Sequence, residues 1–357
     1  MLRNKETGKC LSAYKILSVA VILSTLFFTA CTSNGTAKTE NTSANISATA
    51  VGNASSTAVP KGSFSVTYDD EDTNTAIGSN ATIVTLNGTS IAVDGTGASA
   101  SGSKLNITAG GTYQLSGTLS DGQIIVNTTS KTTVRLILKG VDITCSDSAP
   151  IYIMDAKKAV LILADGTKNS LTDGTKYTLT DVQAQEPSAT LFCKCDMTIT
   201  GNGSLTIAAN YNNGITGKDN LKITGGTISI TAVVDGIKGR DYTAIKNANI
   251  TVDAKADGIK SSNDVDSALG FVSIESGTLN INAGMDGIKA ETDVSISGGT
   301  FIIKSADDAL DSNGSMTISG GSLKLTAVDK GMNAATSLTI TGGNIAFTPS
   351  TKPIPAS

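Results

Sequence analysis

A four-residue phrase, Asp-Gly-Ile-Lys, recurs along the second half of the chain at a nearly fixed interval. Its three full copies are Asp235 to Lys238, Asp257 to Lys260 and Asp286 to Lys289. Variants hold the same place before and after them, so the small residue of the phrase repeats at intervals of 22, 22, 29, 22 and 22 residues. A period in this range is typical of a solenoid, in which each repeat forms one coil and only stacking buries its apolar face.

Each repeat contains two short runs in which apolar and polar residues alternate. The third position of every coil is isoleucine, and this column consists of Ile199, Ile223, Ile245, Ile274, Ile296, Ile318 and Ile340. Alternation with a period of two, in runs rich in Thr, Ile and Val, indicates β-strands. We therefore expect an all-β fold: a single-stranded, right-handed parallel β-helix of about 22 residues per coil, with two strands and a turn in each coil.

Composition divides the chain into four segments. Residues 1–31 are expected to be a lipoprotein signal peptide, because basic residues precede an apolar run that ends at Cys31, the expected site of lipidation. A plain signal peptide cut just before this cysteine is the alternative. Residues 32–60 are expected to be a disordered Ser/Thr/Asn/Ala linker, 61–196 an N-terminal cap with irregular coils, and 197–357 the regular coils with a short tail. This organisation predicts a lipid-anchored protein on the extracellular face of the cell membrane.

The composition excludes several kinds of chemistry. The 357 residues include no His and no Trp. Without imidazole, the chain cannot form a Ser-His-Asp triad, a His-ligated zinc site or a His general base. The formal net charge of −4 argues against nucleic acid as a partner. Carboxylates, amines and hydroxyls are left to carry the function.

Three cysteines follow the predicted signal peptide, namely Cys145, Cys193 and Cys195. An odd number of cysteines, with no histidine to complete a ligand set, is weak support for zinc. The simplest interpretation is that all three are small buried apolar residues. A disulfide from Cys145 to one member of the Cys193/Cys195 pair is the alternative.

Stacked coils place equivalent residues in columns about 4.8 Å apart. One expected column consists of Asp235, Asp257, Asp286 and Asp308, and a second consists of Lys238, Lys260 and Lys289. Two unit charges at this spacing repel by about 1 kcal/mol in water and about 3.5 kcal/mol at an effective dielectric constant of 20, so the carboxylates need compensation. Either turn amides and the lysines balance them within the protein, or they bind a ligand, and the pattern leaves both interpretations open.

The phrase breaks at its next copy, where Asp311 stands at the lysine position. Oxygen-bearing side chains from two adjacent coils gather there with no expected lysine nearby, which suits Ca2+, a cation that takes six to eight oxygen ligands. The candidate metal ligands are Asp286, Glu291, Asp293, Asp307, Asp308, Asp311 and Asn313. A second acidic run, Asp69 to Asp72, is more typical of a solvated loop.

The sequence from Tyr211 to Thr227, with the Asp-Gly-Ile-Lys phrases and the Ser261-Ser262-Asn263 triplet, resembles the bacterial carbohydrate-binding-domain family. The resemblance covers roughly residues 64–345. It implies a cell-surface parallel β-helix that binds Ca2+, acidic plant polysaccharide such as polygalacturonate, and also cellulose.

We therefore expect a non-catalytic protein that binds acidic plant-type polysaccharide, with Ca2+ bridging carboxylates of the protein and of the sugar. Its candidate carbohydrate-binding residues are Lys238, Lys260, Lys289, Asp235, Asp257, Tyr211 and Tyr242. Pectate lyases are also parallel β-helices and use Asp-bound Ca2+ with a Lys or Arg base, so a Ca2+-dependent lyase with Lys289 near the ion is an alternative. Strictly periodic lysines are more typical of a structural ladder than of a catalytic base. A structural or adhesin rod is the third interpretation.

Overall fold

The computed structural model of the chain describes residues 44–47, 64–78 and 80–351. The predicted signal peptide with Cys31 and most of the predicted linker lie outside these residues. Within the described part, no helix is long and apolar enough to cross a membrane.

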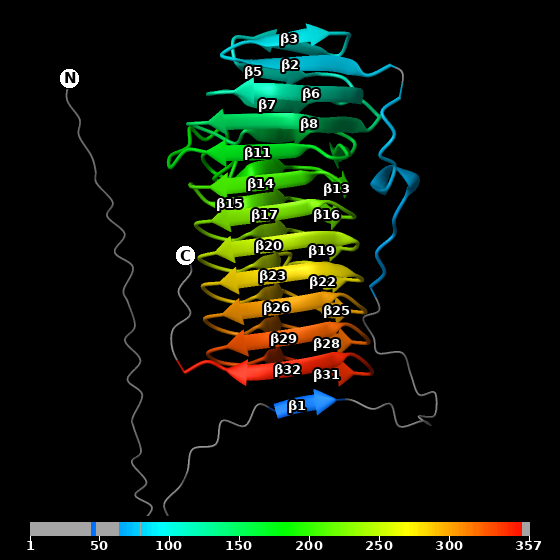
Figure 1. The fold of residues 1–357 in the computed structure, drawn as a ribbon, viewed down its shortest axis with the longest axis vertical. Coiled ribbons are helices and arrows are strands. Elements are labelled where there is room, and N and C mark those ends of the chain that lie inside the picture. Colours follow the sequence, from blue (N-terminus) through cyan, green and yellow to red (C-terminus); the bar gives the residue numbers. More distant parts are fainter. Residues whose placement is uncertain (1–43, 48–63, 79, 352–357) are drawn as a thin grey trace, which may run out of the picture. The chain divides into compact units, whose positions relative to one another are not determined.

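The described residues form two long sheets of 21 and 11 strands, in which almost all neighbours are parallel (Figure 1). The expectations of an all-β fold and of long parallel sheets are confirmed. Pairs such as Ile237 with Ile259 join residues one repeat apart, as in a solenoid. The register predicted from the repeat is also confirmed, because Met197 pairs with Leu221, Leu221 with Thr243, and so on to Leu338.

Each regular coil contributes three strands. The first column of the larger sheet is β10 (Ala159–Leu163), β13 (Met197–Gly201), β16 (Asn220–Ile223), β19 (Tyr242–Ile245), β22 (Phe271–Ile274), β25 (Val294–Ile296), β28 (Ser315–Ile318) and β31 (Ser337–Ile340). Its second column is β11 (Lys168–Asp173), β14 (Ser204–Ala209), β17 (Thr227–Ala232), β20 (Ala248–Ala254), β23 (Gly277–Ala283), β26 (Thr300–Ser305), β29 (Ser322–Ala327) and β32 (Asn344–Pro349). The smaller sheet contains β9 (Ile151–Asp155), β12 (Ala189–Cys193), β15 (Asn213–Gly217), β18 (Ile237–Gly239), β21 (Ile259–Ser261), β24 (Ile288–Ala290), β27 (Leu310–Ser312) and β30 (Met332–Ala334).

The expectation of two strands per coil is wrong, because the Asp-Gly-Ile-Lys phrase itself begins a third strand. In β18, β21 and β24 the isoleucine of the phrase is fully buried and the lysine points outward. Three residues are too few for alternation to be recognised in the sequence. The predicted isoleucine column does lie in the core: its members are 0% exposed except Ile340, which is partly buried in the last coil.

The first strands of the two sheets include antiparallel hairpins and pairings with register shifts. The hairpins are β2 (Thr82–Gly88) with β3 (Ile91–Asp94), and β4 (Ala98–Ser101) with β5 (Lys104–Ile107). The irregular coils contain β6 (Gly111–Leu119), β7 (Gln123–Asn127) and β8 (Val134–Cys145).

One part of the predicted disordered linker is a strand in the structure. Strand β1 (Ala44–Ser47) pairs antiparallel with β32, the last strand of the larger sheet. The outer edge of a terminal strand carries backbone donors and acceptors that need partners, and β1 supplies them.

Residues 64–78, which we call the strap, run along the outer face of the first column (Figure 1). The strap contains the 3-10 helix η1 (Asp70–Asp72), and the Phe64 ring stacks on Phe271 at a centroid distance of 3.9 Å. Asp72 is 0% exposed and Arg135 lies 3.0 Å from Glu71. The expectation of a solvated acidic loop is therefore wrong, since ion pairs dock the acidic run onto the sheet.

All three predicted buried cysteines are buried. Cys193 and Cys195 belong to the main hydrophobic core, and their Sγ atoms lie 3.4 Å apart. The thiol of Cys145 instead faces the Asp147 carboxylate at 3.7 Å. The interpretation of these residues as small buried apolar side chains is confirmed.

Candidate functional site

The aspartates of the repeated phrase form a buried ladder at the corner where each second-column strand ends. Asp235, Asp257, Asp286 and Asp308 are 2–4% exposed. The Oδ1 of each one accepts the backbone N–H of the equivalent residue in the next coil, over 3.2, 3.1, 3.0 and 2.8 Å, ending at Lys330. The acceptance of turn amides is thus observed, although each amide belongs to the neighbouring coil. These hydrogen bonds hold successive coils in register.

The lysines of the phrase balance this ladder unequally. Lys260 and Lys289 approach Asp257 and Asp286 to 2.8 and 2.7 Å, whereas Lys238 lies 3.6 Å from its aspartate. Burial disfavours the charged lysines, but hydrogen bonds to the aspartates outweigh it and raise the pKa of Lys260 and Lys289. The ammonium of Lys238 is therefore the one held least by the protein.

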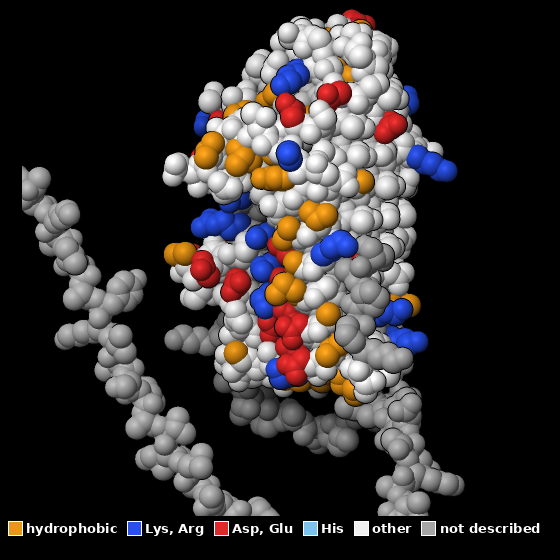
Figure 2. Space-filling model, turned by 90° about the vertical axis from the view of Figure 1, so that its left-hand side faces the viewer, with side chains coloured by type: hydrophobic (Ala, Val, Ile, Leu, Met, Phe, Trp, Pro, Cys, Tyr) orange, Lys and Arg blue, Asp and Glu red, His pale blue; other side chains and the backbone are white. Residues whose placement is uncertain are grey.

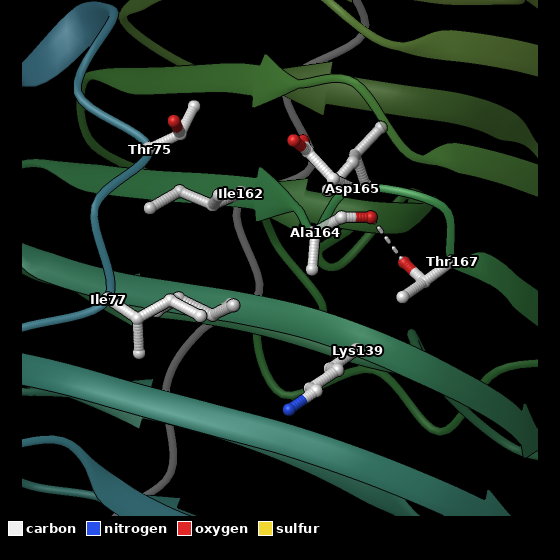
Figure 3. Close-up of a pocket in the computed structure, with 9 residues that line it drawn as sticks. Thr75, Ile77, Lys139, Ile162, Ala164, Asp165 and Thr167 are labelled. Atoms are coloured by element: carbon white, nitrogen blue, oxygen red, sulfur yellow. Dashed lines mark hydrogen bonds between the residues drawn. The ribbon is translucent and has the colours of Figure 1, made fainter.

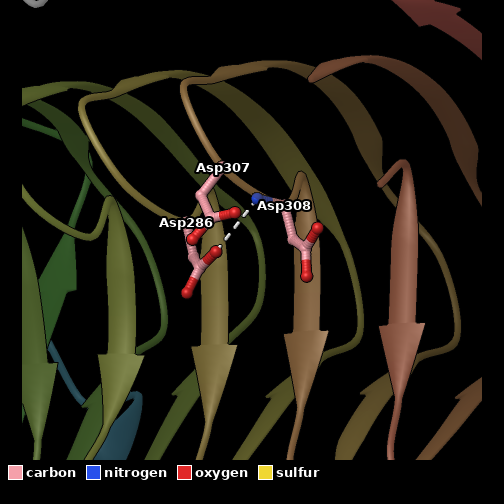
Figure 4. A group of neighbouring side chains, drawn as sticks. All are labelled: Asp286, Asp307 and Asp308. Atoms are coloured by element: carbon pink, nitrogen blue, oxygen red, sulfur yellow. Dashed lines mark hydrogen bonds between the residues drawn. The ribbon is translucent and has the colours of Figure 1, made fainter. Parts of the chain in front are cut away.

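The coil that breaks the phrase brings three carboxylates together. Oxygen atoms of Asp286, Asp307 and Asp308 lie within 4.8 Å of one another, and Figure 4 shows the three side chains at adjacent turns. Burial, and to a smaller extent the charge of Asp307, raises the pKa of Asp308. Lys330 lies 3.8 Å from Asp308, a long ion pair. Lys289, 2.7 Å from Asp286, balances part of the charge of these three carboxylates, and a cation would relieve the remainder.

The other predicted metal ligands lie in separate contacts. Asp311 pairs with Lys289 at 2.8 Å, so the expectation that no lysine lies near the acidic residues is wrong. Glu291 accepts a hydrogen bond from Asn313, and Asp293 accepts one from the backbone of the following coil. Lys289 reaches both Asp286 and Asp311, because Asp311 takes the next place in the lysine column and is the register partner of Lys289.

The two tyrosines predicted to contact sugar differ in exposure. Tyr242 is buried, stacks on Phe271 at 4.9 Å and belongs to the cluster that the strap covers, so its assignment to carbohydrate binding is corrected. The strap is distant from Tyr242 in the sequence, so the sequence did not indicate that the strap covers this tyrosine. Tyr211 is partly buried and stacks on Tyr177 at a centroid distance of 4.1 Å.

The side of the protein that carries the lysine ladder and the three carboxylates, which we call the charged side, also contains a pocket that was not predicted. Figure 2 shows basic side chains in the middle of this side and acidic side chains toward the C-terminal coils. The pocket, of about 70 Å³, is lined by Ser188, Asn213, Thr216, Gly217, Lys218, Lys238, Arg240 and Ser262. A signal for it exists in the sequence, because Lys218 and Arg240 follow the smaller-sheet strands at equivalent positions of two adjacent repeats.

A larger pocket of about 290 Å³ lies between the strap and the sheet (Figure 3). Ile77 and Thr75 of the strap face Ile137 and Ile162, while Lys139 and Asp165 are among the other lining residues. It shares no residue with the charged side, and its aliphatic lining gives it a different chemical character.

Comparison with known proteins agrees with this architecture. The profile of a family described as "Carbohydrate-binding domain-containing protein" matches residues 101–353. A protein of that description from Acetivibrio thermocellus is 43% identical over 153 residues, which are 43% of this chain and 54% of the relative. The chain thus matches about half the length of that relative.

A solved structure is also similar. It is described as the polysaccharide lyase-like protein from C. thermocellum, gadolinium derivative, and is 36% identical with a TM-score of 0.63. The match covers 74% of this chain and 98% of that one. The family match spans most of the coils and of the charged side described above, and the chain belongs to the family of carbohydrate-binding domain-containing proteins.

Proposed function

We propose that this protein is a right-handed β-helix that binds acidic plant-type polysaccharide along its charged side, without cleaving it, at the outer face of the cell membrane to which Cys31 tethers it. The observation that carries the proposal is the arrangement of charge. Basic side chains and the cluster of three carboxylates lie on the same side of a protein of the carbohydrate-binding family. An extended polyuronate can meet ammonium groups directly and protein carboxylates through a bridging cation.

The carboxylates of Asp286, Asp307 and Asp308 are the proposed calcium ligands. Two oxygens bound to one Ca2+ lie no more than about 5 Å apart, since each is 2.3–2.6 Å from the ion. The observed limit of 4.8 Å between these oxygens fits that requirement. The similar solved structure is a gadolinium derivative, and trivalent gadolinium, like Ca2+, is a hard cation that prefers oxygen ligands. Carboxylates of the glycan and water would complete the coordination.

Replacing Asp307 tests this ion site, because its exposed side chain can be changed with little effect on packing. Saturating Ca2+ is expected to raise the stability of the unsubstituted protein, by about 2.7 kcal/mol at a concentration of 100 times Kd. In Asp307→Asn, thermal unfolding should show less than half of this calcium-dependent rise and an unchanged Tm in chelator. Asp264→Asn, an exposed carboxylate of another loop, is the control and should keep the full rise. A Tm loss of equal size in chelator would refute the site.

Retention on polygalacturonate, followed together with ultraviolet absorbance, separates binding from cleavage. We expect Ca2+-dependent retention and no new absorbance, because Lys289, the lysine nearest to the proposed ion, is held between two carboxylates at 2.7 and 2.8 Å. Elimination by a lyase would leave an unsaturated, absorbing product, so a Ca2+-dependent rise in absorbance would contradict binding without catalysis. No retention on acidic or neutral glycans would favour a structural rod.

A further inference from the structure

The pocket beside Lys238 lies at one end of the outward-facing column that contains the lysine ladder. Thr216, Lys238, Lys260 and Lys289 pair successively in the smaller sheet. Thr216 is short, so the space that a longer side chain would fill above Lys238 is open and forms part of the pocket. None of the eight residues that line the pocket is acidic, whereas three of them are cationic.

The three cations keep donors available for a ligand. Lys238 makes a long contact of 3.6 Å with Asp235, and Arg240 makes one of 3.3 Å with Asp241. The guanidinium has five N–H donors, so a single contact leaves several free to bind. Lys218 pairs with Glu186 at 3.0 Å, and this carboxylate is shared with Lys194. The rest of the lining consists of Ser188, Asn213, Thr216, Gly217 and Ser262.

The lysines farther along the column are engaged differently. Lys260 lies 2.8 Å from Asp257, and its side chain is 19% exposed, compared with 31% for Lys238. Lys289 is held by two carboxylates. Equal spacing in the sequence therefore conceals unequal function: one lysine is open to a ligand, and the following two balance the buried aspartates.

We propose that the pocket between Lys218, Lys238 and Arg240 receives one carboxylate group of a uronate glycan and sets the preference for acidic over esterified sugar. This inference rests on the proposed polysaccharide binding and assigns it a specific anionic subsite. The pocket is small, about 70 Å³, which suits a carboxylate group. The ring would stay outside, with its carboxylate bound by Lys and Arg donors in charge-assisted hydrogen bonds.

Calorimetric titration with an oligogalacturonate, and with its fully methyl-esterified form, tests the subsite. All titrations are made at one Ca2+ concentration with the purified protein. Lys238→Met and Arg240→Gln should each weaken binding of the acidic oligomer by about tenfold while leaving the weak binding of the ester unchanged. Lys260→Met should lose less than about threefold, and Lys304→Met, on another face of the solenoid, should match the unsubstituted protein. Since Arg240 is 45% exposed, its substitution also separates binding from folding.

Two outcomes would overturn the assignment in distinguishable ways. If the unsubstituted protein binds the acidic oligomer and Lys238→Met loses no more affinity than Lys260→Met, the pocket is not the anionic subsite but the proposed function stands. If the unsubstituted protein does not bind the acidic oligomer at all, the proposed function fails and the subsite fails with it. An equal loss for acid and ester would likewise show that the pocket does not read the carboxylate.

Discussion

Asp72→Ala is expected to lower the free energy of unfolding by about 3 kcal/mol, because it removes one partner of a buried ion-pair group. Asp72 is 0% exposed, and its two carboxylate oxygens lie 2.7 Å from Lys158 and 2.9 Å from Lys222. Without it, Lys222 loses its paired carboxylate and Lys158 keeps only Asp69. Thermal unfolding measures the loss, and limited proteolysis of the strap shows where the structure opens first.

Asp70→Ala is the matched control, since Asp70 is an exposed carboxylate in the same short helix. It should leave the Tm and the proteolysis pattern close to those of the unsubstituted protein. Equal effects of the two substitutions would show that the strap is not held by Asp72.

The pH dependence of stability provides a second test of the role of Asp72. Burial alone would raise the pKa of Asp72, but hydrogen bonds from Lys158, Thr198 and Lys222 outweigh it and lower the pKa to about 2. A depressed folded pKa means that the stabilisation is complete above the unfolded value of about 3.9 and is lost as the pH falls toward 2. Asp72→Ala should remove this part of the acid sensitivity. An unchanged slope between pH 4 and pH 2 would contradict the ion-pair account.

Gly258→Ala is expected to cost about 2 kcal/mol, within the usual range for overpacking a core. A Cβ on Gly258 would overlap the Cγ2 methyl of Ile281 and lie 2.6 Å from the carbonyl oxygen of Gly287 in the next coil. The glycine of the Asp-Gly-Ile-Lys phrase is therefore required by close approach of the coils. Chemical denaturation of the single variant measures the cost.

The chain itself suggests which second substitution should restore stability. In one coil Ala309 stands at the glycine position of the phrase. The strand position that holds Ile281 and Ile303 in the preceding coils is Leu325 in that coil. Leucine has no branch at Cβ and so leaves room for the alanine methyl group. The backbone hydrogen bond that follows the alanine, from Leu310 N–H to the Gly331 carbonyl, is 3.3 Å long, whereas the equivalent bond from Ile259 to Gly287 is 3.0 Å. Ile281→Leu should thus recover part of the stability lost in Gly258→Ala. A double variant that is merely additive would show that the methyl group is not the obstacle.

The periodic part of the fold could be predicted from the sequence because each coil repeats the same local pattern. The isoleucine column and the register of seven coils follow from one alternating run with a fixed period. The strap could not be predicted, because Asp72 pairs with Lys158 and Lys222, which lie 86 and 150 positions further along the chain, without any local signal. The acidic run from Asp69 to Asp72 was predicted to be a solvated loop because the sequence does not reveal its lysine and arginine partners.

The candidate site was predicted in part for a similar reason. Stacking explains why Asp286 and Asp308 are neighbours, and sequence adjacency adds Asp307. The direction of side chains such as Glu291 and Asp293 is set by turn geometry, which directs them to Asn313 and to a backbone amide. Composition alone cannot separate such contacts from ligation of an ion.

The most direct test of binding to acidic polysaccharide is the affinity of the purified protein for oligogalacturonate, measured by calorimetry with Ca2+ and again with chelator. We expect binding in Ca2+ that weakens by at least about tenfold in chelator, and only weak binding of the fully methyl-esterified oligomer. Failure to bind the acidic oligomer in Ca2+, or equal affinity for the acid and its ester, would contradict this expectation.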